Sequence, residues 1–112
     1  MRTIKFRGKD KYSDDWQFGD LAHTIGGVTV NQTMVKEDTV GQYTGVKDKN
    51  GVGIYEGDIV SVEPGMSRSK VYFHNGNFKI FTFPIGILNF HKQINLNIIG
   101  NIYDNPNLLN DE

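Results

Sequence analysis

Hydrophobic and polar residues alternate in short runs along most of this chain. Near the start, Ile4 and Phe6 fall on one side of an extended backbone, and Lys5 and Arg7 fall on the other. This period of two predicts a half-buried β-strand over residues 3–7. Similar runs predict strands at residues 16–18, 21–25, 28–30, 59–62, 70–73, 78–83, 85–90, 94–99 and 102–103. We therefore expect an all-β chain with no α-helix longer than two turns.

Pairs of turn-forming residues separate these runs. Asn50-Gly51, Asn75-Gly76 and Gly26-Gly27 each lie between two predicted strands, and such pairs favour tight β-hairpins because both residues tolerate a positive φ. The glycine-rich stretch 41–60 holds most of this turn chemistry. Its expected turn residues are Gly45, Asp48, Asn50, Gly51, Tyr55, Glu56, Gly57 and Asp58. The composition of residues 64–69 predicts an exposed, mobile loop. Residues 31–40 are expected to form either one helical turn or a loop.

The length of 112 residues fits a single domain. We divide it into an N-terminal β-hairpin-rich part at 1–54, a C-terminal part at 55–103 and a tail at 104–112, with the join at 52–56. From Ile54 onward the order of strands and turns resembles a small SH3-like barrel. The predicted architecture is the N-terminal part packed on that barrel, with frayed residues at 110–112.

Composition supports strands over helices. Alanine occurs once and leucine five times, while aromatic residues make up 12% of the chain. There is no cysteine, no apolar run near 18 residues and no apolar leader segment. We expect a soluble protein of the bacterial cytoplasm that does not enter a membrane.

Charge is distributed unevenly along the chain. Residues 1–11 hold five basic residues and one acid, and residues 64–103 hold four basic residues and no acid: Arg68, Lys70, Lys79 and Lys92. The intervening residues 12–63 are acidic. Opposite charges that neutralise each other in the fold would explain this pattern, and so would a basic face that meets phosphates or an acidic partner.

No arrangement of residues indicates catalysis or metal binding. His23, His74 and His91 lack the local spacing of a metal site, no serine lies in a nucleophile motif, and the central glycines do not form a phosphate-binding loop. Asp48 and Asp58 are expected to accept hydrogen bonds within turns. Tyr43, Tyr55 and Tyr103 fit either buried rings or stacking platforms. We expect no cofactor and no enzymatic activity.

Three blocks resemble the YopX family, small proteins carried by phages and prophages of Gram-positive bacteria. They comprise residues 2–10 (RTIKFRGKD), 39–60 (TVGQYTGVKDKNGVGIYEGDIV) and 98–109 (IIGNIYDNPNLL). Gly8 and Gly53 depart from the pattern, since a bulkier and a charged residue are usual there. The resemblance implies that a phage or prophage encodes the protein. It does not imply any particular activity, because the family's biochemical function is not established.

The Phe-rich segment suggests self-association. Alternation sends Phe81 and Phe83 to the face opposite Phe78 and Ile80, and Ile85 and Ile87 follow directly. A small barrel has one interior, so we expect Phe81, Phe83, Ile85 and Ile87 to be covered by a second copy. The leading hypothesis is a non-enzymatic accessory protein that binds itself and a phage or host protein. The alternative is a nucleic-acid-binding barrel that uses Arg68, Lys70, Lys79 and Lys92, although a net charge of −1 disfavours strong electrostatic binding.

Overall fold

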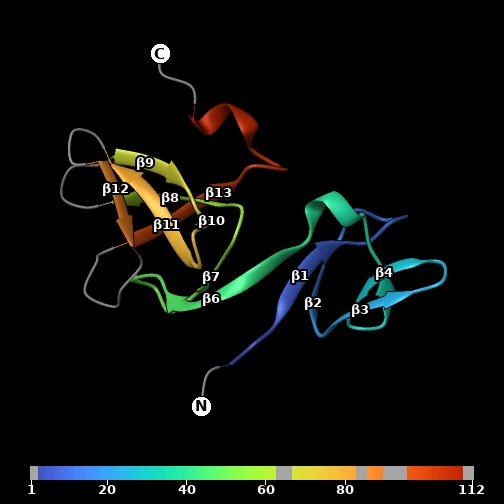
Figure 1. Cartoon of the computed structure of the whole chain (residues 1–112). Helices are drawn as coiled ribbons and strands as arrows, with labels where there is room; N and C mark the ends of the chain where they lie inside the picture. The colour runs from blue at the N-terminus through green and yellow to red at the C-terminus, as the bar shows by residue number, and fades with distance from the viewer. Residues whose placement is uncertain (1–2, 63–66, 83–85, 90–95, 110–112) are drawn as a thin grey trace. The chain divides into compact units, whose positions relative to one another are not determined.

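Successive hairpins build this chain, and a computed structural model describes it over residues 3–62, 67–82, 86–89 and 96–109. Within those ranges the helices are two 3₁₀ turns, η1 (Glu37–Thr39) and η2 (Pro106–Leu109). The prediction of an all-β chain with no long helix is therefore confirmed. The chain divides into two compact units, Met1–Gly45 and Val46–Glu112, which are described separately below (Figure 1).

The first unit contains two antiparallel sheets. In one, β1 (Phe6–Lys9) lies between β2 (Trp16–Gly19) and β6 (Gly41–Lys47); the other has the order β3 (Leu21–Thr24), β4 (Gly27–Val30), β5 (Thr33–Met34). Val28, Val30 and Val35 form its buried core, and Phe6 packs against them. Phe6 therefore points inward as predicted, whereas Ile4 precedes the strand and is exposed.

The second unit begins where the end of β6 pairs with β7 (Gly53–Tyr55). Two further antiparallel sheets follow, β13 (Leu96–Asn101)–β8 (Asp58–Val62)–β9 (Ser67–Lys70) and β10 (Tyr72–His74)–β11 (Asn77–Thr82)–β12 (Gly86–Asn89). The core comprises Ile54, Val60, Val71, Ile80 and Leu96. Across the described residues of this unit, no sheet closes on itself. The SH3-like arrangement thus stays a prediction.

Two of the three predicted hairpin turns lie where expected. His74 pairs with Asn77, and Asn75 and Gly76 between them have φ values of 51° and 82°. Asn50-Gly51 joins β6 to β7, but only Gly51 has a positive φ there. The third turn is shifted by one residue: Thr24 pairs with Gly27, so Ile25 and Gly26 form the loop.

Two sequence predictions are wrong. Residues 67–69 of the predicted loop belong to β9, where Ser69 is buried and pairs with Val60. Ile102 and Tyr103 form a turn rather than a strand, because the Asn101 side chain accepts hydrogen bonds from the Tyr103 and Asp104 amides. Within the tail at 104–112, Pro106–Leu109 form η2.

Residues 31–40 and the predicted join at 52–56 can also be located in the structure. Residues 31–40 contain both β5 and the single turn η1. The predicted join at 52–56 lies within the second unit, around β7.

Candidate functional site

The hairpin turn at residues 48–52 is organised by the buried carboxylate of Asp48. The Asp48 Oδ1 atom accepts hydrogen bonds from the backbone amides of Asn50 and Val52, both at 2.9 Å. Its Oδ2 atom accepts a third from the Ile98 amide in β13 at 3.2 Å. The expected Asx-type bond is present, and the same side chain ties this turn to a strand 50 residues away.

This environment changes the acidity of Asp48. Burial, which leaves the residue 8% exposed, by itself favours the neutral acid and raises its pKa. The three amide donors together outweigh burial, and the nearby Lys49 charge acts in the same direction, so that the pKa of Asp48 lies below its ordinary value of 3.8. Asp48 is therefore held as a carboxylate whose hydrogen bonds are directed at the backbone.

The next turn, Tyr55 to Asp58, is built in the same way. The Asp58 Oδ2 atom accepts a hydrogen bond from the Tyr55 amide at 2.7 Å, and both residues are buried. Gly57 has a φ of 94°, and a Cβ atom there would lie 3.1 Å from the Tyr103 ring. Both the backbone and the space therefore require glycine here, and the missing side chain leaves the room that the Tyr103 ring occupies.

Asparagine side chains organise the segment that follows β13. The Asn105 Oδ1 atom accepts from the Asn101 amide at 3.3 Å, and the Asn105 amide donates to the Asn101 carbonyl at 2.8 Å. A Cβ atom at Gly100 would approach Asn105 Oδ1 to 2.6 Å. Asp48, Asp58, Asn101 and Asn105 thus all bond to backbone groups, which makes them structural members of the motif blocks.

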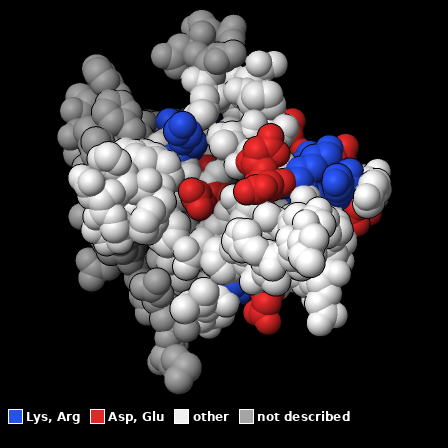
Figure 2. Space-filling model, turned by 45° about the vertical axis from the view of Figure 1, so that its right-hand side comes forward, with Lys and Arg blue, Asp and Glu red and all other residues white. Residues whose placement is uncertain are grey.

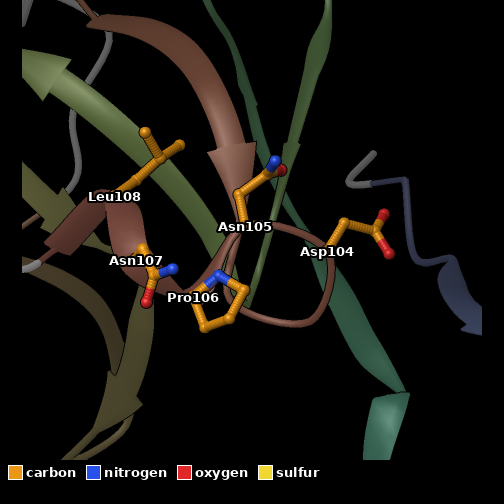
Figure 3. Close-up of a pocket in the computed structure, with 5 residues that line it drawn as sticks. All are labelled: Asp104, Asn105, Pro106, Asn107 and Leu108. Carbon is orange, nitrogen blue, oxygen red and sulfur yellow. The ribbon is translucent and has the colours of Figure 1, made fainter.

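A shallow pocket of about 290 Å³ adjoins this segment, lined by Asp104, Asn105, Pro106, Asn107 and Leu108 (Figure 3). All five residues are consecutive in the chain. The Asp104 carboxylate and the Asn107 amide do not converge on a common point in Figure 3. The pocket therefore offers no set of groups with an evident chemical role.

The structure places the predicted basic residues of the second unit on two strands. Arg68 and Lys70 alternate along β9, the edge strand of its sheet, and both are exposed. Lys79 is half-buried in β11 opposite Tyr72, and Lys92 lies outside the described residues. In the view of Figure 2, basic side chains lie in small groups beside acidic ones. Arg68 and Lys70 are thus the pair of this set that shares one exposed face.

The predicted self-association residues are only partly described. Phe81 in β11 and Ile87 in β12 are directly opposite each other in the antiparallel register. Phe83 and Ile85 lie outside the described residues. In the backbone, Phe81 and Ile87 of the predicted set are therefore close together.

Sequence reasoning missed one surface, on the first unit. Arg7 is opposite Phe18 and Lys9 is opposite Trp16, and residues opposite each other share a face of the sheet. The Tyr43 amide donates to the Lys5 carbonyl, and the Lys5 ammonium lies 5.4 Å from the centre of the Tyr43 ring. We call this set the basic–aromatic face: Lys5, Arg7, Lys9, Trp16, Phe18 and Tyr43. The alternation of Lys5, Arg7 and Lys9 was visible in the sequence, but the strand register was needed to place the rings beside them.

Histidines and other possible metal ligands do not cluster. Across the described parts of the chain, no group of three or more His, Asp or Glu side chains could hold a metal ion. His23 in β3 and His74 in β10 are both exposed, and His91 lies outside the described residues. No helix in those parts is long and apolar enough to cross a membrane.

Comparisons with known proteins agree with the predicted resemblance. The family model described as "YopX protein" matches residues 9–110. Among solved structures, the crystal structure of protein EF1440 from Enterococcus faecalis is similar, with a TM-score of 0.66, 22% sequence identity and coverage of 98% of this chain and 100% of that one. At that identity the likeness concerns the fold. No match is found among curated proteins. Because the family model spans nearly the whole chain, this chain belongs to the YopX family.

Proposed function

We propose that this protein is a phage or prophage accessory protein that acts by binding other macromolecules, including copies of itself, and not by catalysis. The supporting observation is the use of its motif side chains. Asp48, Asp58, Asn101 and Asn105 each accept hydrogen bonds from backbone amides. Groups used in this way stabilise the turns of the fold. We therefore expect binding to occur at strand faces and edges, which are suited to macromolecular partners.

The proposal includes an SH3-like arrangement of the second unit. A single residue, Val71, separates β9 from β10, and these strands belong to different sheets. The Val71 amide donates to Asp58 O, and its carbonyl accepts from Gly57. A bent strand shared by two sheets is the way small barrels turn their corners. The cytoplasm of the host cell is the proposed location.

Self-association is proposed through Phe81, Phe83, Ile85 and Ile87. Light scattering after size exclusion tests it, and a mass near the 12.7 kDa of one chain at micromolar concentration would contradict it. Phe81→Asp should shift a larger mass towards the monomer, while Lys79→Ala should not. A pull-down from phage-infected host cells, analysed by mass spectrometry, tests for a further protein partner.

An alternative function is nucleic-acid binding through Arg68, Lys70, Lys79 and Lys92. The observation in its favour is the exposure of Arg68 and Lys70 on one face of an edge strand. Fluorescence anisotropy with labelled oligonucleotides at low salt tests it. Binding should weaken steeply with added salt and in the Arg68→Gln/Lys70→Gln variant.

A further inference from the structure

We propose that the basic–aromatic face of the first unit binds single-stranded nucleic acid. This site lies in a different unit from Arg68 and Lys70, and it does not depend on self-association. Lys5 directly precedes β1, Arg7 and Lys9 alternate along it, and three aromatic rings lie on the strands at either side. Single-stranded chains are held by this combination, in which rings stack on bases and ammonium groups meet phosphates.

Two of the rings on this face, Trp16 and Tyr43, lie beside cations. The Arg7 guanidinium lies 4.5 Å from the centre of the Trp16 ring, and the Lys9 ammonium lies 5.6 Å from it. Arg7 is only 7% exposed, so it positions the indole and does not itself contact a ligand. Trp16 and Tyr43 are half-buried, while Phe18 is 48% exposed. Phe18 therefore offers the most accessible ring for a base.

The other side of the same sheet is already occupied. Phe6 packs on the core valines, and a Cβ atom at Gly8 would lie 3.0 Å from the Val35 side chain. Residues with odd and even numbers along β1 thus have separate roles. The even positions attach the strand to the core, and the odd positions carry the cations.

Nearby acids indicate where the phosphates would lie. Asp10, in the turn at the Lys9 end of the β1–β2 hairpin, accepts hydrogen bonds from the Tyr12 and Ser13 amides. Asp14 in the same turn pairs with Lys36. Asp14 is neutralised by Lys36, whereas the Asp10 charge disfavours a polyanion at the Lys9 end, so we assign the main phosphate contact to Lys5, beside Tyr43.

The choice of single strands over other polyanions follows from the rings. A duplex keeps its bases stacked on one another, and an acidic peptide has no bases to stack. Either ligand would use the cations alone. The three rings therefore favour a ligand whose bases are free.

Trp16 gives the test a local signal, because it is the only tryptophan in the chain. The full chain is titrated with a short oligothymidylate at low salt while tryptophan fluorescence is recorded. We expect saturable quenching. Phe18→Leu, which keeps an apolar side chain without a π face, should weaken binding at least about fivefold. Lys5→Gln should lower the slope of log K against log salt by about 0.7.

Matched controls separate this site from the alternative one. Arg68→Gln, in the second unit, should leave the titration unchanged, and circular dichroism should show that Phe18→Leu remains folded. Absence of quenching at low salt would overturn the proposal. Equal quenching by polyglutamate or by duplex DNA would overturn the assignment of the ligand. If Arg68→Gln abolishes binding and Phe18→Leu does not, the β9 pair is the site instead.

Discussion

Two hairpin turns in this protein use an aspartate for the same local purpose in opposite surroundings. In the second unit, Asp48 is buried and accepts three backbone hydrogen bonds, one of them from β13. In the first unit, Asp10 accepts from the Tyr12 and Ser13 amides two and three residues further on, and these bonds are exposed to solvent. The first carboxylate links distant strands, and the second shapes one loop. Burial and sequence distance, more than the residue type, determine what such a turn contributes.

The largest expected effect comes from removing the buried acceptor. Asp48→Ala leaves the Asn50, Val52 and Ile98 amides without their acceptor, and we expect a loss of about 3 kcal/mol in the free energy of unfolding. Asp10→Ala exposes its two amides to water and should cost less than about 1 kcal/mol. Urea unfolding followed by circular dichroism measures both. Equal losses would show that burial does not distinguish the two turns.

Hydrogen exchange would locate the same effect. In Asp48→Ala, the Ile98 amide should lose protection together with the Val52 amide, although they lie far apart in sequence. In Asp10→Ala the change should be confined to the hairpin turn. Loss at Val52 with full protection at Ile98 would mean that the bond to β13 is dispensable.

The next largest effect tests how tightly the second unit is packed around its turns. Gly57→Ala forces an alanine into the left-handed backbone region and places its methyl group 3.1 Å from the Tyr103 ring. We therefore expect a loss of about 2–3 kcal/mol in the free energy of unfolding. Gly51→Ala is the matched control, since its φ is 84° and nothing lies within 4 Å of the added atom. That change should cost only about 1 kcal/mol. Chemical unfolding of both variants separates the backbone strain from the steric clash.

Acid should weaken the contribution of the Asp48 turn. The pKa of Asp48 is lower in the folded state than its ordinary value of 3.8, so its charge favours folding above that value. This contribution is lost as the pH falls through the lowered folded pKa. Urea midpoints measured between about pH 5 and pH 2 should therefore fall more steeply for the natural chain than for Asp48→Asn. Parallel curves would contradict a lowered pKa.

The sequence correctly predicted those turns that depend on residues close together in the chain. Asn75 and Gly76 specify their turn through their own backbone preferences, and the fold places both at a positive φ. Ile102 and Tyr103 have the composition of a strand, yet the Asn101 side chain captures the following amides and ends β13. Gly8 looked like a departure from the family pattern, and in the fold a Cβ atom there would lie 3.0 Å from the side chain of Val35, 27 positions further along. Contacts between residues so far apart in sequence leave no pattern in any short stretch of the chain.

The same limit applies to the two candidate surfaces. Alternation alone placed Lys5 and Arg7 on one side of a strand. Their relation to Trp16 and Phe18 depends on the register of β1 with β2, which a turn of uncertain length does not fix. For β9, the predicted loop hid the fact that Arg68 and Lys70 share a strand face. Charge counts found the basic segments, and only the fold showed which residues lie side by side.

The smallest expected effect concerns the exposed ion pair of the first turn. The Asp14 carboxylate pairs with the Lys36 ammonium, and both side chains are well exposed, at 60% and 42%. Such pairs contribute at most about 0.5–1 kcal/mol, because water screens them and ordering two side chains costs entropy. Asp14 also has a φ of 66°, so alanine would add backbone strain to the lost charge. Asn tolerates the left-handed region as Asp does, and Asp14→Asn therefore isolates the ion pair. We expect a change below about 0.5 kcal/mol that disappears in high salt. A loss as large as that of Asp48→Ala would mean that the exposed turn is as important to the first unit as the buried turn is to the second.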